Sequence, residues 1–379
     1  MFATKHSFDI IKLMSSSTAS DQRKAVTAIK VLIQTCKAAR DSIVNHPQST
    51  ESPPLSVVHK DLLSLLSLVH GTVTKLSLAL KPSSPAYSAC LVPLKELSDR
   101  IAAISHCANL FNATIHGATL VKEVLSVAIN VVETVQTLAT VFLEIEDSGE
   151  RSRSADEYLM RTGAVHCVIE IARSEDGLPE DNLTAVRRHW LKDAGALQDG
   201  VREVGDMIED AQAEIDTDCE DGWNELGIEP SKPLTDKELK IAKKVLTVLR
   251  LCNLLHQKVI SDILRTTDSL SNSFLDNLAS SSPALLSTSD ELISTLDSPQ
   301  DPDSITTELN VLKGVIDGIR THLSILDNQP NSLAVSRKGT FLNEVSVPTN
   351  PNSRGKWFKS CFDQLTKAIN SVLEAANET

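Results

Sequence analysis

The chain has 379 residues, with 50 Asp and Glu against 37 Lys and Arg, and its formal net charge is −13. This excess of negative charge repels nucleic-acid phosphates and anionic lipid surfaces, so a broad basic face for direct nucleic-acid binding is not expected. Hydrophobic residues make up 41% of the sequence but aromatic residues only 3%. The core must therefore be built from Leu, Val, Ile and Ala, which suits helix-on-helix packing.

Targeting and membrane signals are weak in this sequence. The first residues lack the continuous apolar core of a signal peptide, and no later stretch reaches the ~18 uninterrupted apolar residues of a membrane span. The seven cysteines are scattered at spacings typical of separate helices, which favours free thiols in a reducing compartment. We therefore expect a soluble, intracellular protein with no membrane partner.

Apolar residues recur in alternating steps of three and four through most of the chain, which places them on one stripe of an α-helix. The valines of the fourth segment would suit a strand by propensity, but their period is helical. In chain order the pattern predicts helices at about 20–45, 55–81, 86–112, 121–142, 155–174, 182–211, 236–264, a weaker helix within 266–300, and then 301–326 and 354–376.

These segments predict an all-α protein of about ten long amphipathic helices in two packed up-and-down bundles. Because the last helix follows a long polar loop, the sequence leaves open which bundle it joins. The expected organisation is a flexible N-terminus at 1–19, an N-terminal bundle at 20–175, a C-terminal bundle at 176–326 with an acidic loop at 212–234, a flexible loop at 327–353, and a closing helix at 354–377.

Motifs for catalysis are absent from the sequence. Residues 200–206 have the glycine spacing of a phosphate loop, but Asp206 stands where the lysine is required. No nucleophile elbow, His-Glu-x-x-His pair or dinucleotide fingerprint occurs. Cys252 and His256 are four residues apart and could face one ion, yet the further ligands that zinc needs are missing. We expect no catalytic residue, no cofactor, no metal site and no enzymatic activity.

The strongest local anomaly is a run of acids without Lys or Arg between Glu203 and Glu229. Residues 212–234, the loop that contains the later part of this run, are called the acidic segment below. Asp216-x-Asp218-x-Glu220 resembles a calcium loop, but the turn glycine is one position late and the twelfth position is Gly227 rather than Glu.

Two other interpretations of the acidic segment stay open. It is either a solvated linker between helices or a docking strip for a basic segment of a protein partner. Trp223 favours docking, because an aromatic side chain in an acidic loop must either anchor the loop or await a partner. The candidate protein-binding residues are Glu214, Asp216, Asp218, Glu220, Asp221, Trp223 and Glu225.

Four Ser-Pro pairs stand at helix boundaries. The favoured interpretation is turn and first-turn chemistry, in which proline loses no hydrogen bond. Proline-directed phosphorylation is the alternative, since added charge at a helix start can be stabilising. The serines are Ser52, Ser84, Ser282 and Ser298.

Several short segments occur in a characteristic order: 74–82 (TKLSLALKP) with the Ser-Pro pair at 84–85, 117–124 (GATLVKEV), 162–165 (TGAV), 178–182 (LPEDN), 236–239 (DKEL), and a closing helix opened by Trp357. Together they resemble the family of Grap2 and cyclin-D-interacting proteins, also called cyclin-D-binding proteins. The resemblance covers roughly residues 55–375 and is carried by the order of the helices and by these short segments rather than by one diagnostic motif.

This resemblance implies an all-helical, two-bundle interaction protein of the cytoplasm and nucleus, without a cofactor. The implied protein resembles negative regulators of cell-cycle progression and of helix-loop-helix transcription factors. Its implied partners are therefore cyclins or helix-loop-helix factors. The Ser-rich stretch 266–300 and the long loop before Trp357 depart from the pattern, and no basic DNA-reading region is present. The identity of the partner is therefore inherited from the family.

A helical-bundle adaptor of the vinculin, catenin or talin type is the alternative, because such adaptors also stack long helices into bundles. Actin or adhesion partners would distinguish it from a regulator.

Overall fold

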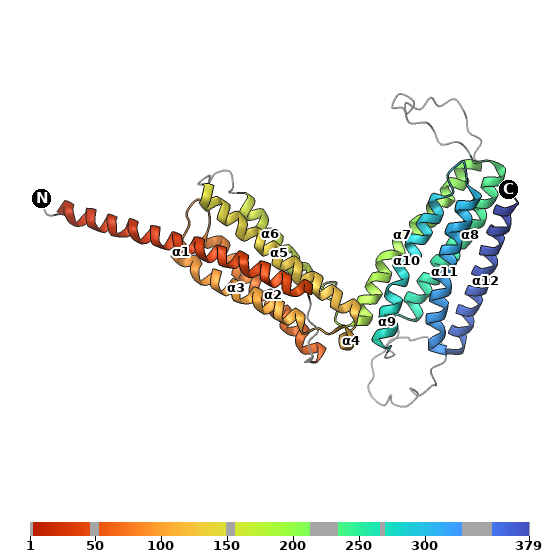
Figure 1. The fold of residues 1–379 in the computed structure, drawn as a ribbon, viewed down its shortest axis with the longest axis horizontal. Helices are drawn as coiled ribbons and strands as arrows, with labels where there is room; N and C mark the ends of the chain where they lie inside the picture. Colours follow the sequence, from red (N-terminus) through yellow and green to blue (C-terminus); the bar gives the residue numbers. More distant parts are fainter. Residues whose placement is uncertain are drawn as a thin grey trace, which may run out of the picture. The chain divides into compact units, whose positions relative to one another are not determined.

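The computed structural model describes residues 3–45, 53–148, 156–212, 234–265, 270–327 and 351–378. The regular structure of these ranges is helical throughout, which confirms the all-α prediction. The chain divides into two compact units, Met1–Ala185 and Val186–Thr379, whose helices are labelled in Figure 1.

The first unit is a ring of five long helices. These are α1 (Ala3–Asn45), α2 (Leu55–Ala79), α3 (Tyr87–Asn109), α5 (Ala118–Ser148) and α6 (Glu157–Arg173), with the one-turn α4 (Ala113–His116) before α5. Helix α1 packs on α3 and α5, α2 packs on α3 and α6, and α6 closes the ring against α5. The predicted stripes form the core: Leu62, Val69 and Val73 of α2, for example, are completely buried.

Helix α1 begins at Ala3, earlier than the start at about residue 20 that the apolar period predicts. The flexibility of 1–19 stays a prediction. The chain has no glycine or proline before Pro47, and only those residues strongly oppose helix propagation. The Ser-rich stretch 15–20 lowers the apolar periodicity without ending the helix.

The second unit contains α7 (Asn182–Gln212) apart from its first turn, and then α8 (Asp236–Asp262), α9 (Asn272–Ala279), α10 (Ser281–Ser294), α11 (Pro302–Asp327) and α12 (Pro351–Asn377). The expected weak helix within 266–300 is thus a pair, α9 and α10. Helix α12 packs on α8 and α11, which settles the position of the closing helix. Lys244 of α8 donates from Nζ to the Ser371 carbonyl of α12 at 2.8 Å.

The boundary between the units lies after Ala185, later than the expected break at residue 175. The connection after α6 packs on the first unit because Leu178, only 8% exposed, donates its N–H to the Ala172 carbonyl at 2.8 Å. Asn182 is 3% exposed, and its side-chain oxygen accepts the N–H of Leu120 at 3.0 Å. That bond satisfies a backbone donor in the first turn of α5.

Helices α2 and α5 are long and apolar enough, by length and composition, to cross a membrane. Neither helix contains the uninterrupted apolar run expected of a membrane span, so the sequence did not predict one there. In the structure both helices belong to the five-helix ring, and 39% and 44% of their most apolar windows are buried there.

We expect Gly117→Ala to destabilise the first unit by at least about 2 kcal/mol. Gly117 has a φ of 96°, and a Cβ at this position would collide with the Asn182 side chain. Circular dichroism during denaturation measures the loss, and tryptophan fluorescence should not change, because all three tryptophans follow Val186. Gly71→Ala, in the open on α2, is the control and should stabilise the unit by up to about 1 kcal/mol; equal effects at the two glycines would contradict the prediction.

Candidate functional site

The acidic segment supplies all the predicted protein-binding residues, and the structure does not test them. Residues 213–233 lie outside the described residues. These include Glu214, Asp216, Asp218, Glu220, Asp221, Trp223 and Glu225.

Exposed acids of α7, just before the acidic segment, and of α10 extend its charge onto folded helices. Glu203 and Asp206 are exposed on α7, and Glu203 lies close enough to Asp290 of α10 to affect its titration. Partial burial raises the pKa of the Asp290 carboxyl, and repulsion from Glu203 and Glu291 raises it further. We call Glu203, Asp206, Glu209, Asp210, Asp290 and Glu291 the acidic face.

Directly after the acidic segment, a capping box fixes the start of α8. The Glu238 carboxylate accepts the Thr235 N–H at 2.7 Å, and Thr235 Oγ1 accepts the Glu238 N–H at 3.4 Å. The same carboxylate accepts the Gln300 N–H at 2.9 Å. Partial burial raises the pKa of Glu238, but the hydrogen bonds from Thr235, Gln300 and Ser298 together lower it below its ordinary value. The acidic segment is thus followed by a firmly anchored helix.

A buried polar network, which sequence analysis missed, joins the helices of the second unit. Ser282 donates its hydroxyl hydrogen to Asp193 of α7 at 2.7 Å, so His256 Nε2 must donate to Ser282 Oγ at 2.9 Å. The His256 ring stacks on Trp190 with centroids 4.5 Å apart. Trp190 in turn donates from Nε1 to the Leu278 carbonyl at 3.1 Å. No local sequence motif predicts this network, because its hydrogen-bonded partners lie up to 89 residues apart.

These residue types would serve a hydrolase, but the geometry is unsuitable for nucleophilic catalysis. A nucleophilic serine passes its proton to histidine, whereas Ser282 donates to a carboxylate. Ser282 and His256 are both 0% exposed, so no substrate could reach the hydroxyl. Cys252 is equally buried; burial, with a smaller effect of Cys361, raises the pKa of its thiol to about 12. The geometry therefore supports a structural role for this network.

The other Ser-Pro serines differ in accessibility. Ser84 is exposed in the turn between α2 and α3. Ser298 is half-buried and donates from Oγ to Glu238 Oε1 at 3.3 Å. Ser52 lies outside the described residues. Ser84 is therefore the described Ser-Pro serine that a kinase reaches without breaking a buried contact.

A seam of polar contacts joins α2 to α6 in the first unit. Ser77 Oγ lies 2.7 Å from Thr162 Oγ1, and one turn away Thr74 Oγ1 lies 3.2 Å from His166 Nε2. His166 stacks on His70 with centroids 4.0 Å apart. Burial lowers the pKa of His166, and the neighbouring His70 lowers it further. Segments 74–82 and 162–165, both quoted above for a family resemblance, thus meet at this seam.

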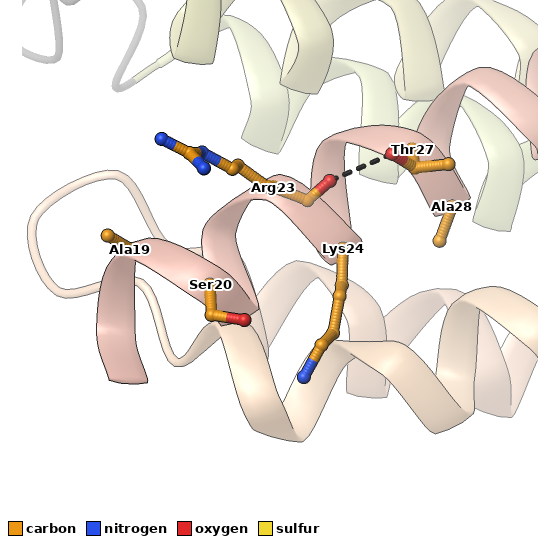
Figure 2. Close-up of a pocket in the computed structure, with 6 residues that line it drawn as sticks. All are labelled: Ala19, Ser20, Arg23, Lys24, Thr27 and Ala28. Carbon is orange, nitrogen blue, oxygen red and sulfur yellow. Dashed lines mark hydrogen bonds between the residues drawn. The ribbon is translucent and has the colours of Figure 1, made fainter. Parts of the chain in front are cut away.

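Two of the hollows on the surface of the described residues lie on α1 and in the second unit. The first is lined by Ala19, Ser20, Arg23, Lys24, Thr27 and Ala28, all from α1. Figure 2 shows the Arg23 and Lys24 side chains pointing to different sides of this helix, so their charges do not converge on one ligand. We assign no binding role to this hollow.

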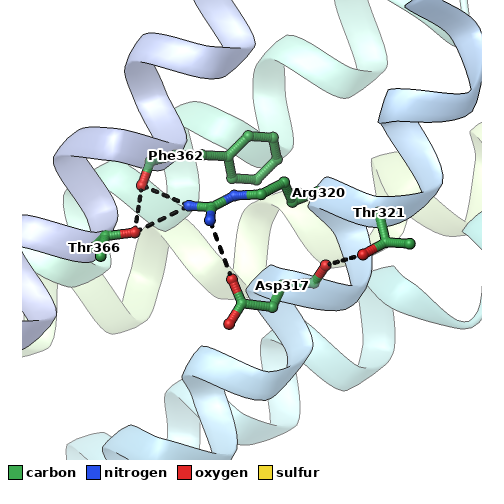
Figure 3. Close-up of polar contacts among 5 residues, drawn as sticks. All are labelled: Asp317, Arg320, Thr321, Phe362 and Thr366. Atoms are coloured by element: carbon green, nitrogen blue, oxygen red, sulfur yellow. Dashed lines mark hydrogen bonds and ion pairs between the residues drawn. The ribbon is translucent and has the colours of Figure 1, made fainter. Parts of the chain in front are cut away.

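The second hollow is a groove in the second unit, bordered by the end of α8, the last turns of α11 and the first turns of α12. Arg320 of α11 defines one wall. Its Nη2 donates to the Phe362 carbonyl and to Thr366 Oγ1, both at 2.9 Å, while its Nη1 lies 3.5 Å from Asp317. Figure 3 shows the guanidinium held between α11 and α12 by these contacts.

We expect the second unit to lose stability as the pH falls from about 6.5 to about 4. Burial lowers the pKa of His256 to about 4, with Asp193 opposing this shift in part, so between these values only the unfolded chain takes up the proton. The cost at pH 4 is on the order of 3 kcal/mol. Denaturation followed by tryptophan fluorescence measures the free energy of unfolding at each pH, and His256→Gln should remove this part of its pH dependence. The same pH dependence of the unfolding free energy in the variant and the wild type would contradict the assignment.

We expect Thr162→Val to destabilise the first unit by about 1–3 kcal/mol, because the buried Ser77 hydroxyl loses its cross-helix acceptor. Adding Ser77→Ala should restore most of the lost stability, since neither partner then remains unpaired. A double-mutant cycle by circular dichroism measures this coupling. Strictly additive effects of the two substitutions would show that the seam contributes nothing.

Comparison with known proteins gives two matches to family models along the chain. Residues 61–210 match "Grap2 and cyclin-D-interacting, N-terminal", and residues 219–321 match "Grap2 and cyclin-D-interacting, C-terminal". Helices α1 and α12 lie outside the matched ranges. A comparison with curated proteins finds no match. The two matches cover most of the chain in the family's own order, and the chain therefore belongs to the Grap2 and cyclin-D-interacting family.

Proposed function

We propose that this protein is a non-enzymatic regulator that acts by binding other proteins, and that the acidic segment docks a basic segment of the partner. The observation that carries the proposal is the acidic face, which continues the charge of the acidic segment onto α7 and α10. Burial is the main cause of the raised pKa of Asp290, and repulsion from the neighbouring carboxylates Glu203 and Glu291 adds to it. Such a surface selects and steers a basic partner.

The family name indicates the class of partner. Its members are described as interacting with Grap2 and cyclin D, which supports a cyclin as the partner. From the resemblance described above we propose helix-loop-helix transcription factors as the other candidate partners and negative regulation of cell-cycle progression as the outcome. Cytoplasm and nucleus are the proposed locations. A helix-loop-helix segment suits this mode of recognition, because a helix can lay one face on a helical bundle.

The absence of catalysis is part of the same proposal. The one arrangement of Asp, Ser and His discussed above is buried, and its hydrogen bonds run in the wrong direction for a nucleophile. Turnover of a small molecule by the purified protein would contradict this part.

Neutralising the acidic segment should strongly weaken capture of the partner. The variant carries Glu214→Gln, Asp216→Asn, Asp218→Asn, Glu220→Gln, Asp221→Asn and Glu225→Gln. Tagged full-length protein is purified from cells with its bound proteins, which are identified by mass spectrometry. Cyclins or helix-loop-helix factors should be recovered with the wild type and reduced at least about tenfold with the variant.

The matched control neutralises six exposed acids of the first unit: Asp61, Asp99, Glu144, Asp147, Glu175 and Asp176. This control changes the net charge equally and should retain the partners. Recovery of cytoskeletal or adhesion proteins, unaffected by either set of substitutions, would contradict the proposal and favour the vinculin-like adaptor.

A further inference from the structure

The groove between α8, α11 and α12 has an apolar floor and a cationic rim. Its volume is about 310 Å³. Four apolar side chains form the floor, each no more than 6% exposed: Ile263, Leu323, Phe358 and Phe362. The charged lining residues are Arg320, Arg354, Lys359 and Asp363.

The charge of the rim is opposite to that of the protein as a whole, which is −13. Arg320 is offset by Asp317. Arg354 donates to the Asp262 carbonyl at 3.2 Å, which orients its guanidinium without neutralising it. Within the described ranges, neither Arg354 nor Lys359 has a carboxylate at ion-pair distance. Two positive charges thus remain beside the floor, against the single carboxylate of Asp363.

The size of the groove limits what can enter it. Pockets for complete small ligands span about 300–1,000 Å³, and this groove lies at the lower end of that range. It accommodates one or two bulky side chains rather than the full face of a helix. An occupant must therefore insert a short apolar anchor and leave its remaining contacts to the rim.

We propose that this groove binds an acidic segment of a protein partner, with one bulky apolar side chain on the Phe358–Phe362 floor and carboxylates paired with Arg354 and Lys359. The proposal rests on the proposed function, in that the protein acts by binding proteins. It adds a second binding surface, whose charge is opposite to that of the acidic face. Arg354 is already held by a backbone carbonyl, so part of the cost of ordering it has been met before binding.

The test is a fluorescence-polarisation titration of full-length protein with a labelled synthetic peptide, Asp-Glu-Asp-Trp-Leu-Glu-Asp. The double variant Arg354→Glu, Lys359→Glu should weaken binding at least about tenfold. Ser324→Trp, an exposed lining position, should block the groove without removing a core side chain. The matched control, Lys243→Glu with Lys367→Glu, changes two exposed lysines of the same unit and should bind as the wild type.

Several results would overturn the proposal. Unchanged affinity in the double variant or in Ser324→Trp, with folding verified by tryptophan fluorescence, would exclude the groove. If a peptide with Ala in place of Trp and Leu binds as tightly as the original, or if the matched control loses as much affinity as the double variant, binding depends on charge attraction alone. A several-fold gain in affinity on deletion of residues 213–233 would show that the protein's own acidic segment is the occupant.

The outcomes separate this inference from the proposed function. If the peptide fails to bind while cyclins or helix-loop-helix factors still co-purify through the acidic segment, only the groove proposal fails. If no such protein co-purifies, the proposed function fails, whereas the peptide titration still reports directly on the groove.

Discussion

Every long helix of this protein must bury one apolar stripe, and the rest of the structure depends on that constraint. With aromatic residues at only 3%, the core fills with Leu, Val, Ile and Ala, whose side chains pack well between near-parallel helices. The first unit meets the constraint by closing five helices into a ring. The second meets it by packing α12, which lies far along the chain, against α8 and α11.

Apolar stripes alone specify register loosely, and a small number of buried polar contacts fit the role of fixing it. Ser77 meets Thr162 between α2 and α6, Asn182 binds the first turn of α5, and Ser282 joins α7 to α10. Several segments that carry the family resemblance lie at these contacts. The resemblance therefore reports how the helices are held together, while the acidic face and the groove are made of other residues.

The period of the apolar residues, together with the residues that end helices, was enough to predict the long helices, because each has an uninterrupted apolar stripe. The start of α1 was missed because helix persists there without strong apolar periodicity. The unit boundary was misplaced because the packing of Leu178 and Asn182 is a tertiary effect. The same holds for the sites: the sequence pairs Cys252 with His256, whereas the fold pairs His256 with Ser282, 26 residues away. The groove was equally invisible, since Ile263, Arg320 and Phe358 meet only in space.

Together these features describe two helical units, with an acidic face that we propose as a docking surface and a separate cationic groove in the second unit. The most direct test of the central claim is the association rate of purified protein with purified cyclin D, measured at low and at physiological ionic strength. Docking through the acidic segment predicts a rate that falls steeply with added salt, because steering by exposed charge is screened. A rate independent of salt, or no association at either ionic strength, would contradict the account.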